Sequence, residues 1–421
     1  MKKTNNFAVI ILISLFMNTL LKKIGLPLLC LAALGLSSCT QSKYSYETVP
    51  NDPLQARIYT LDNGLKVYMT VNKDEPRIQT YIAVRVGGKN DPAETTGLAH
   101  YFEHLMFKGT NHFGTMNYEI EKPLLDQIEQ TFEIYRKTTD EAERKAIYHT
   151  IDSLSYEASK YAIPNEYDKL MAAIGANGTN AYTSFDVTCY TEDIPSNEVE
   201  NWAKIQADRF KNCVIRGFHT ELETVYEEKN MSLTRDARKV YEQTLAALFP
   251  HHPYGTQTVL GTQEDLKNPS ITNIKNYYKT WYVPNNMAIC LSGDFDPDQM
   301  IATIDKYFGD MQPNPNLPKL NLPKESDITA PVVREVLGPE AENVTLAWRF
   351  PGAASKELET LQILSQILYN GQAGLIDLDL MQQQKTLSAY CYPMAMSDYS
   401  AFMMAGRPKA GQTLDEVKDL L

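Results

Sequence analysis

Two histidines and a glutamate stand close together in the segment His100-Tyr101-Phe102-Glu103-His104. If this segment is helical, His100 and His104 lie one turn apart on the same face, close enough to bind one metal ion, and Glu103 falls on that face too. Two histidines at this spacing with a carboxylate beside them are typical of a zinc-binding helix. The alternative is a half-buried helix that carries two histidines by chance. We predict a zinc site here.

The flanking sequence predicts how this helix is held. Apolar residues at helical spacing mark its buried side, namely Leu98, Phe102, Leu105 and Met106. Thr95 or Thr96 could cap its first turn, and Gly109 could end it. A hairpin over residues 58–69 and a strand over residues 78–86 precede it, because both segments are rich in β-branched and aromatic residues.

A second helix could complete the metal site. Catalytic zinc sites use three protein ligands and keep a fourth position for water. The acidic run 219–228 is strongly helical, and within it Glu221 and Glu228 are seven residues apart, so they share a face. One of them could bind the metal while the other supports the site from behind. The alternative is an acidic helix face that is simply solvated.

A polar strand follows a glycine-rich entry within residues 175–190. Asn180, Thr183, Ser184 and Asp186 make this strand too polar for the middle of a sheet, so we expect it at an edge. Edge strands can bind an extended peptide through backbone hydrogen bonds. The alternative is an edge that only water contacts.

Composition limits the classes of partner. The chain has 421 residues, 43% of them hydrophobic, and a formal net charge of −12. The first 38 residues hold four lysines and no acid, so the rest of the chain is more acidic still. This charge argues against nucleic acid as a partner. The six cysteines form no C-x-x-C pair, which argues against a cysteine-based zinc or redox site.

The N-terminal segment 1–39 is predicted to be a lipoprotein signal. Its second apolar run ends in Leu36-Ser37-Ser38-Cys39, which resembles a lipobox with Cys39 as the lipidated residue. Residues 1–16 would then precede the true start at Met17. We therefore expect an exported, membrane-anchored bacterial lipoprotein, on the periplasmic or outer-membrane side. The alternative is a signal anchor, and in either case the globular part is exported.

The remaining chain divides into two domains. Residues 40–54 are predicted to be a tether and residues 55–311 a catalytic zinc domain, with a charged helical insertion at 117–162. A proline-rich linker at 312–331 leads to a second domain, 332–421, that repeats the order of elements. Aligning the two copies places Gln362, Ser365 and Gln366 at the positions of His100, Glu103 and His104, so the second copy is expected to bind no metal. We expect this second copy to be incomplete.

These motifs together resemble one known family. The order H-x-x-E-H is that of the inverted zincins. With the acidic helix and the Asn180-Ala181 strand, it resembles the pitrilysin family, which includes insulin-degrading enzyme and the mitochondrial processing peptidases. The resemblance covers about residues 55–421 and implies an α+β fold, in which two similar units of mainly antiparallel sheet are packed with helices.

The resemblance also implies a role for each site residue. His100, His104 and Glu228 would bind one zinc ion, and Glu103 would be the general base. Glu221 would support the site from the second shell of the metal. Asn180 and Ala181 would hold the substrate backbone.

The expected function is that of a zinc-dependent endopeptidase, which hydrolyses peptides or unfolded polypeptides by metal-activated water. The expected partners are a peptide substrate, a membrane through the lipid anchor, and a second half-molecule or partner subunit that closes a chamber. One alternative is a non-catalytic binding subunit of a pitrilysin-like assembly. Another is a zinc hydrolase that acts on something other than peptides.

Overall fold

The computed structural model describes residues 43–421, and the fold below is that of the compact unit Tyr46–Leu421. The predicted lipoprotein segment, including Cys39, lies outside the described residues. Within the described part of the chain, no helix combines the length and the hydropathy needed to cross a membrane.

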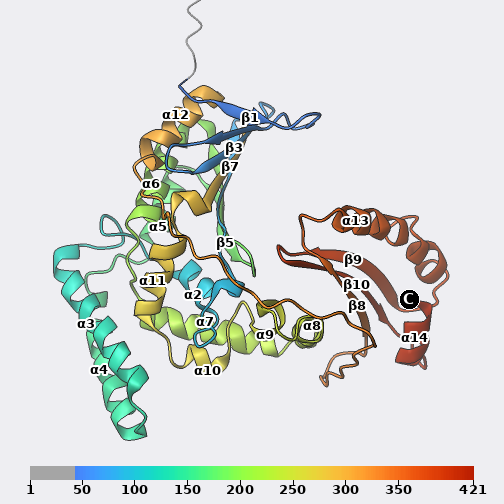
Figure 1. Cartoon of the computed structure of the whole chain (residues 1–421). Helices are drawn as coiled ribbons and strands as arrows, with labels where there is room; N and C mark the ends of the chain where they lie inside the picture. Colours follow the sequence, from blue (N-terminus) through green and yellow to red (C-terminus); the bar gives the residue numbers. More distant parts are fainter. Residues whose placement is uncertain (1–42) are drawn as a thin grey trace, which may run out of the picture. The chain divides into compact units, whose positions relative to one another are not determined.

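A seven-stranded sheet forms the first part of the fold, with the strand order β1-β2-β3-β7-β4-β6-β5 (Figure 1). Neighbouring strands are antiparallel except for β3 and β7, which are parallel. The strands are β1 (Tyr46–Thr48), β2 (Arg57–Thr60), β3 (Lys66–Val71), β4 (Arg77–Val84), β5 (Asn177–Thr183), β6 (Thr188–Pro195) and β7 (Met287–Gly293). The predicted hairpin over 58–69 is confirmed as β2 and β3, because Ile58 pairs with Tyr68. Residues 46–48, expected to be part of an irregular tether, instead form β1 against β2.

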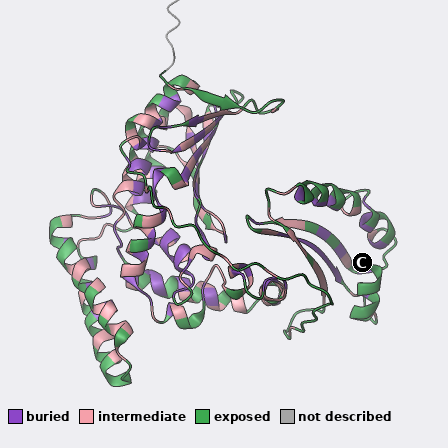
Figure 2. Ribbon diagram, in the orientation of Figure 1, coloured by how far each residue is buried: buried purple, intermediate pink, exposed green. Residues whose placement is uncertain are grey.

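Helices accompany this sheet in the first part of the fold, some packed on its strands and others on neighbouring helices. They are α2 (Leu98–Leu105), α3 (Tyr118–Lys137), α4 (Glu141–Ser159), α5 (Glu166–Ala173), α6 (Val199–Lys211), α7 (Phe218–Leu233), α8 (Asp236–Leu248), α9 (Pro253–Thr256), α10 (Gln263–Leu266), α11 (Ile271–Trp281) and α12 (Pro297–Phe308), with a short 3-10 turn η1 (Gly88–Asn90). The helices α3 and α4 pack against each other and lie within residues 117–162, the segment predicted to be a helical insertion. Buried residues line the strands and the inward faces of the helices (Figure 2).

A second, three-stranded sheet follows the proline-rich segment. Residues 312–331 contain no helix or strand. The sheet has the order β8-β10-β9, all antiparallel, and two α-helices and a short π-helix accompany it. The elements are β8 (Val344–Pro351), α13 (Lys356–Leu368), the π-helix η4 (Asp377–Met381), β9 (Ser388–Ala395), β10 (Tyr399–Arg407) and α14 (Leu414–Leu420). The expected α+β class with mainly antiparallel sheets is therefore confirmed.

One hydrophobic cluster joins residues of both sequence regions. Phe185, Leu248 and Phe249 come from the first region, and Ala401 and Met403 come from β10. These side chains are almost fully buried. Burial at about 25 cal/mol per Å2 of apolar surface makes such a cluster a substantial source of stability.

The structure corrects two local predictions. Residues 175–190, expected to be one strand, are a hairpin of β5 and β6 that turns at 184–187, because Ser184 donates its backbone N–H to the Val187 carbonyl at 2.8 Å. Gly109 does not end α2, which stops at Leu105 with Met106 as its cap. Gly109 instead has φ +98° in the loop that follows, where an added Cβ would lie 2.5 Å from the Phe113 carbonyl oxygen.

Candidate metal centre

The N-terminus of α2 is held by an aspartate rather than by the threonines expected there. Both oxygens of the buried Asp91 carboxylate accept backbone N–H groups, from Gly97 at 2.8 Å, Leu98 at 3.1 Å and Ala99 at 2.9 Å. Three otherwise unpaired donors of the first turn are thereby satisfied. Thr96, expected to cap the helix, donates its hydroxyl to Asp265 instead. Asp91 therefore fixes where the metal helix begins.

The buried side of α2 fixes its rotation. Phe102 is fully buried and packs edge-on against Tyr282, with ring centroids 4.7 Å apart. On an adjacent face, Tyr101 donates a hydrogen bond of 2.5 Å to the Phe218 carbonyl, the first residue of α7. This bond ties α2 to α7, the helix that carries Glu221 and Glu228. The remaining face of α2 presents His100, Glu103 and His104.

Three side-chain atoms converge as a metal site requires. The Nε2 atoms of His100 and His104 lie 3.3 Å apart, and Oε2 of Glu228 lies 3.5 Å and 3.6 Å from them. A tetrahedral zinc ion with bonds of about 2.0–2.1 Å requires its ligand atoms to lie about 3.3 Å from one another. The three atoms therefore fit one zinc ion with little movement. Among the residues from 43 onward, this is the group of three such side chains that can share an ion.

Glu221 orients one of the imidazoles. Nδ1 of His104 lies 2.8 Å from Oε1 of Glu221, so Nδ1 carries the proton and Nε2 keeps a free lone pair for a cation. The other oxygen of Glu221 forms an ion pair with Lys108. Burial alone would raise the pKa of Glu221, but the hydrogen bonds from His104 and Lys108 outweigh it and lower that pKa. The supporting carboxylate is therefore ionised.

The two imidazoles differ in their electrostatic surroundings. Burial, with the nearby charges of His104 and Arg238, lowers the pKa of His100 to about 3. Burial also lowers the pKa of His104, but the carboxylates of Glu221 and Glu228 outweigh it and raise that pKa overall. The His100 imidazole is thus neutral near pH 7, whereas the two carboxylates favour the protonated form of His104.

Glu103 stands beside the three donor atoms without belonging to them. Its side chain is buried, and its Oε2 accepts a 2.5 Å hydrogen bond from the Thr183 hydroxyl. Burial raises the pKa of Glu103, and the bond from Thr183 only partly offsets this. A carboxylate with a raised pKa is better matched to proton transfer near neutral pH than an ordinary one.

A cavity of about 740 Å3 opens over these groups. Its lining includes the side chains of α2 and α7 described above, together with Asn180 and Ala181 of β5. The strand β5 is the last strand of its sheet, so one of its edges has no strand partner. The edge position predicted for this strand is therefore confirmed.

Sequence reasoning missed other residues of this cavity. Arg238 and Tyr241 of α8 line it, and Arg238 forms an ion pair with Glu242 at 2.8 Å. They belong to no motif, so only the fold could reveal them. Lys108 also lines the cavity, from the loop that follows α2, where it pairs with Glu221.

The other histidines lie elsewhere. His219 pairs with Asp152 through Nε2 at 2.7 Å, and His112 pairs with Asp208 through Nδ1 at 2.6 Å.

In the second region, the positions aligned with His100, Glu103 and His104 lie on α13. They hold Gln362, Ser365 and Gln366, which offer neither an imidazole nor a carboxylate to a metal ion.

Two segments of the chain match one peptidase family. Residues 66–123, which contain the metal helix, match the family described as Insulinase (Peptidase family M16), and residues 270–421 match the Peptidase M16 inactive domain. The zinc protease PqqE of Helicobacter pylori is 24% identical over 415 residues, which cover 94% of this chain and 79% of PqqE.

Solved structures show the same fold. A protease from Helicobacter pylori superimposes with a TM-score of 0.68 at 20% identity, over 90% of this chain and 78% of that one. Pitrilysin superimposes with a TM-score of 0.61 at 17% identity, over 88% of this chain. Only 36% of the pitrilysin chain is covered, so the chain spans about a third of that protein.

Proposed function

The chain belongs to peptidase family M16, the pitrilysin family, and from this premise we propose that it is a zinc-dependent endopeptidase acting on peptides or unfolded polypeptides. The observation that supports this most directly is the convergence of His100, His104 and Glu228, whose donor atoms lie 3.3–3.6 Å apart beside the carboxylate of Glu103. A carboxylate that lies beside the three donor atoms without being one of them supports a catalytic role rather than peptide binding alone.

Each residue of the site has a part in the proposed reaction. When bound by His100, His104 and Glu228, zinc supplies a Lewis acid that activates water and polarises a carbonyl. Glu103 takes a proton from the attacking water and passes it to the leaving amine, which is typically worth about 10²- to 10⁴-fold in rate. Thr183 holds the Glu103 carboxylate in place through its 2.5 Å hydrogen bond.

The edge strand β5 supplies the substrate site. A peptide in extended conformation would add to the unpaired edge through backbone hydrogen bonds and would be recognised with little regard to sequence. Asn180 and Ala181 lie on this strand and line the cavity, so a peptide bound there would cross the metal residues.

The test is hydrolysis of a peptide library by wild type and by Glu103→Gln. We expect wild-type cleavage within peptide chains that stops when a chelator removes the metal. Glu103→Gln should keep one zinc per chain but lose cleavage, whereas His100→Ala and His104→Ala should lose both. A zinc-loaded wild type that binds peptides and leaves them intact would instead favour the non-catalytic binding subunit. Cleavage at the normal rate by Glu103→Gln would contradict the mechanism.

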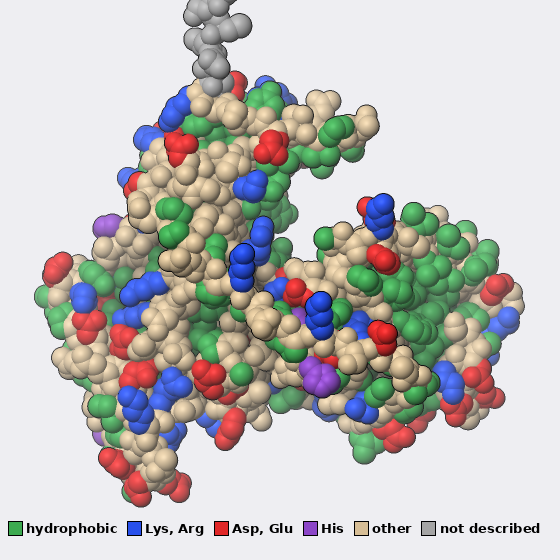
Figure 3. Space-filling view, in the orientation of Figure 1, with side chains coloured by type: hydrophobic (Ala, Val, Ile, Leu, Met, Phe, Trp, Pro, Cys, Tyr) green, Lys and Arg blue, Asp and Glu red, His purple; other side chains and the backbone are tan. Residues whose placement is uncertain are grey.

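We also propose a second half-molecule or partner subunit. Large apolar side chains are exposed in the second region, including Ile363, Ile367 and Leu387, each more than half exposed. Figure 3 shows hydrophobic side chains gathered over the three-stranded sheet, whereas charges of both signs are interspersed elsewhere on that face. Exposed apolar patches of this kind mark interaction surfaces. Sedimentation of the purified chain, alone and with candidate subunits, tests this proposal.

Export and lipid anchoring at Cys39 are proposed from the leader sequence. Mass spectrometry of the mature protein should find a lipidated N-terminal cysteine at position 39. The Cys39→Ser variant should leave the membrane fraction, and an unprocessed N-terminus in the wild type would contradict the proposal.

A further inference from the structure

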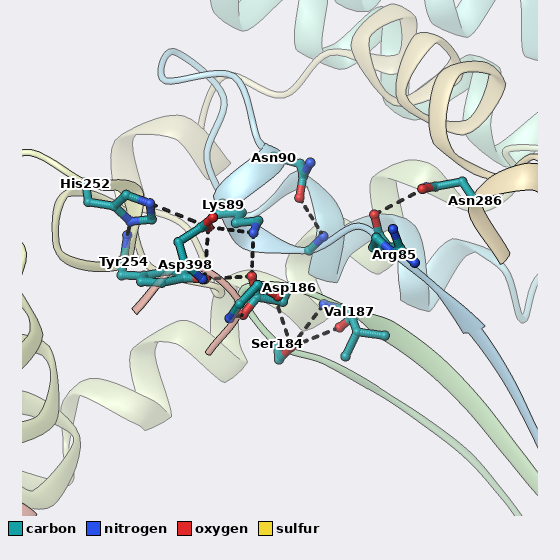
Figure 4. Close-up of polar contacts among 12 residues, drawn as sticks. Arg85, Lys89, Asn90, Ser184, Asp186, Val187, His252, Tyr254, Asn286 and Asp398 are labelled. Atoms are coloured by element: carbon teal, nitrogen blue, oxygen red, sulfur yellow. Dashed lines mark hydrogen bonds and ion pairs between the residues drawn. The ribbon is translucent and has the colours of Figure 1, made fainter. Parts of the chain in front are cut away.

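A single lysine binds two aspartates from turns that are far apart in the sequence. The ammonium of Lys89, in η1, lies 2.6 Å from Oδ1 of Asp186 and 2.7 Å from Oδ2 of Asp398 (Figure 4). The Lys89 side chain is only 14% exposed and that of Asp186 18%, so this ion pair is largely shielded from solvent, whereas the Asp398 side chain is 38% exposed. Charge pairs in such surroundings interact more strongly than pairs on an open surface.

The two aspartates belong to different sheets. Asp186 lies in the turn between β5 and β6, and Asp398 lies in the turn between β9 and β10. The turns also touch directly, since the backbone N–H of Ser397 donates to Oδ2 of Asp186 at 3.0 Å. Tyr254 donates its hydroxyl to Oδ1 of Asp186 at 2.7 Å and accepts the backbone N–H of Asp398 at 3.1 Å. Without Lys89, the two carboxylates would face each other without a cation between them.

The first of these turns continues directly into the catalytic site. The backbone N–H of Gly88 donates to the Ser184 carbonyl at 2.9 Å, and that of Lys89 donates to the Phe185 carbonyl at 3.1 Å. Ser184 follows Thr183, whose hydroxyl binds Glu103. The position of Thr183 relative to Glu103 matters for catalysis. Catalytic groups must be held to within about 0.5 Å, because a misplacement of about 1 Å can cost about 100-fold in rate.

We propose that Lys89 is a positioning residue, which ties the β9–β10 turn of the second region to the β5–β6 turn and so holds the substrate edge strand beside Glu103. The second region, which offers no metal ligands of its own on α13, would thereby contribute to catalysis through Asp398 and Ser397. The effect on catalysis rests on the proposed peptidase function, whereas the effect on the β5–β6 turn does not.

Hydrogen exchange tests the structural step independently of activity. In the full chain, Lys89→Met and Asp398→Asn should each speed amide exchange about tenfold across residues 177–187, with no change in α2 or in the insertion α3–α4. Adding Asp398→Asn to Lys89→Met should then have little further effect, because the two residues act through one contact. A matched control is Lys306→Met, which removes another lysine–carboxylate pair, the exposed pair with Glu200. Unchanged exchange over 177–187 in both variants, or a general rise throughout the chain, would overturn the proposal.

Peptide kinetics test the catalytic step. Lys89→Met should lower kcat/KM about tenfold, through kcat as well as KM, because the same strand holds Thr183 against Glu103, while the zinc content stays at the wild-type value. Lys89→Arg should recover most of this loss, because a guanidinium can bind both carboxylates. A wild type without peptidase activity would refute the proposed function but leave the exchange experiment to decide the role of Lys89. Normal kcat/KM in Lys89→Met would refute its role in catalysis.

Discussion

The hydroxyl of Thr183 on the edge strand lies 2.5 Å from Oε2 of Glu103 on the metal helix. A residue of the proposed substrate strand thus directly orients the proposed general base. The geometry of the strand and the geometry of the proton transfer are therefore coupled, because movement of β5 would carry the Thr183 hydroxyl away from the carboxylate.

Removing this hydroxyl should slow catalysis without affecting the metal. Thr183→Val keeps the shape of the side chain but frees the Glu103 carboxylate to rotate, so we expect kcat to fall about tenfold. Thr183→Ser retains the hydroxyl and is the matched control. Steady-state kinetics with a cleaved peptide, together with zinc analysis, provide the measurement; equal kcat values for wild type and Thr183→Val would contradict the coupling.

Glu221 should matter for zinc affinity more than for fold. Glu221→Gln removes the charge that faces Nδ1 of His104, and losses of partners behind a metal ligand typically weaken binding about 10- to 100-fold. Glu223→Gln, an exposed carboxylate on the same helix, serves as the control. Competition with a chelator of known affinity gives the dissociation constants, and equal values for the two variants would exclude a supporting role for Glu221.

The site could be predicted from the sequence to the extent that its chemistry is local. His100, Glu103 and His104 lie within five residues, so helix geometry alone places them on one face. The seven-residue spacing of Glu221 and Glu228 likewise predicts a shared face. Spacing alone does not say which of them lies near both Nε2 atoms and which lies behind His104; the family resemblance implied the first role for Glu228 and the second for Glu221, and the distances agree with it.

Contacts between distant segments could not be predicted in this way. Asp91 caps α2 although it lies six residues before Gly97 in the sequence. The nearer threonines offered a simpler cap, so local sequence rules did not predict this one. Lys89 and Asp398 are separated by 309 residues and belong to no common motif. Such pairings depend on how the two sheets are brought together, which local propensities do not encode.

The cap formed by Asp91 should stabilise the metal helix. Asp91→Ala would leave three N–H groups at the start of the helix without acceptors, and loss of a helix cap typically costs about 0.5–2 kcal/mol. We therefore expect a lower free energy of unfolding in urea and weaker zinc binding by α2. Asp91→Asn retains one side-chain oxygen and should lose less. Unfolding curves of equal midpoint for Asp91→Ala and wild type would show that the cap contributes nothing.

The buried cysteines should react slowly until the chain unfolds. Burial raises the pKa of the Cys189 thiol to about 11, and it raises that of Cys391 to about 11 as well. The thiolate is the reactive form, so at pH 8 only about one thiol in a thousand would be ionised at either position, compared with about a quarter for a free cysteine.

In a background lacking Cys30 and Cys39, iodoacetamide should label the folded chain at least about tenfold more slowly than the chain in guanidinium. Raising the pH toward 10 should speed labelling of the folded chain, because the thiolate fraction grows as the pH approaches the raised pKa. Rapid labelling of Cys189 at pH 8 would contradict its burial in β6.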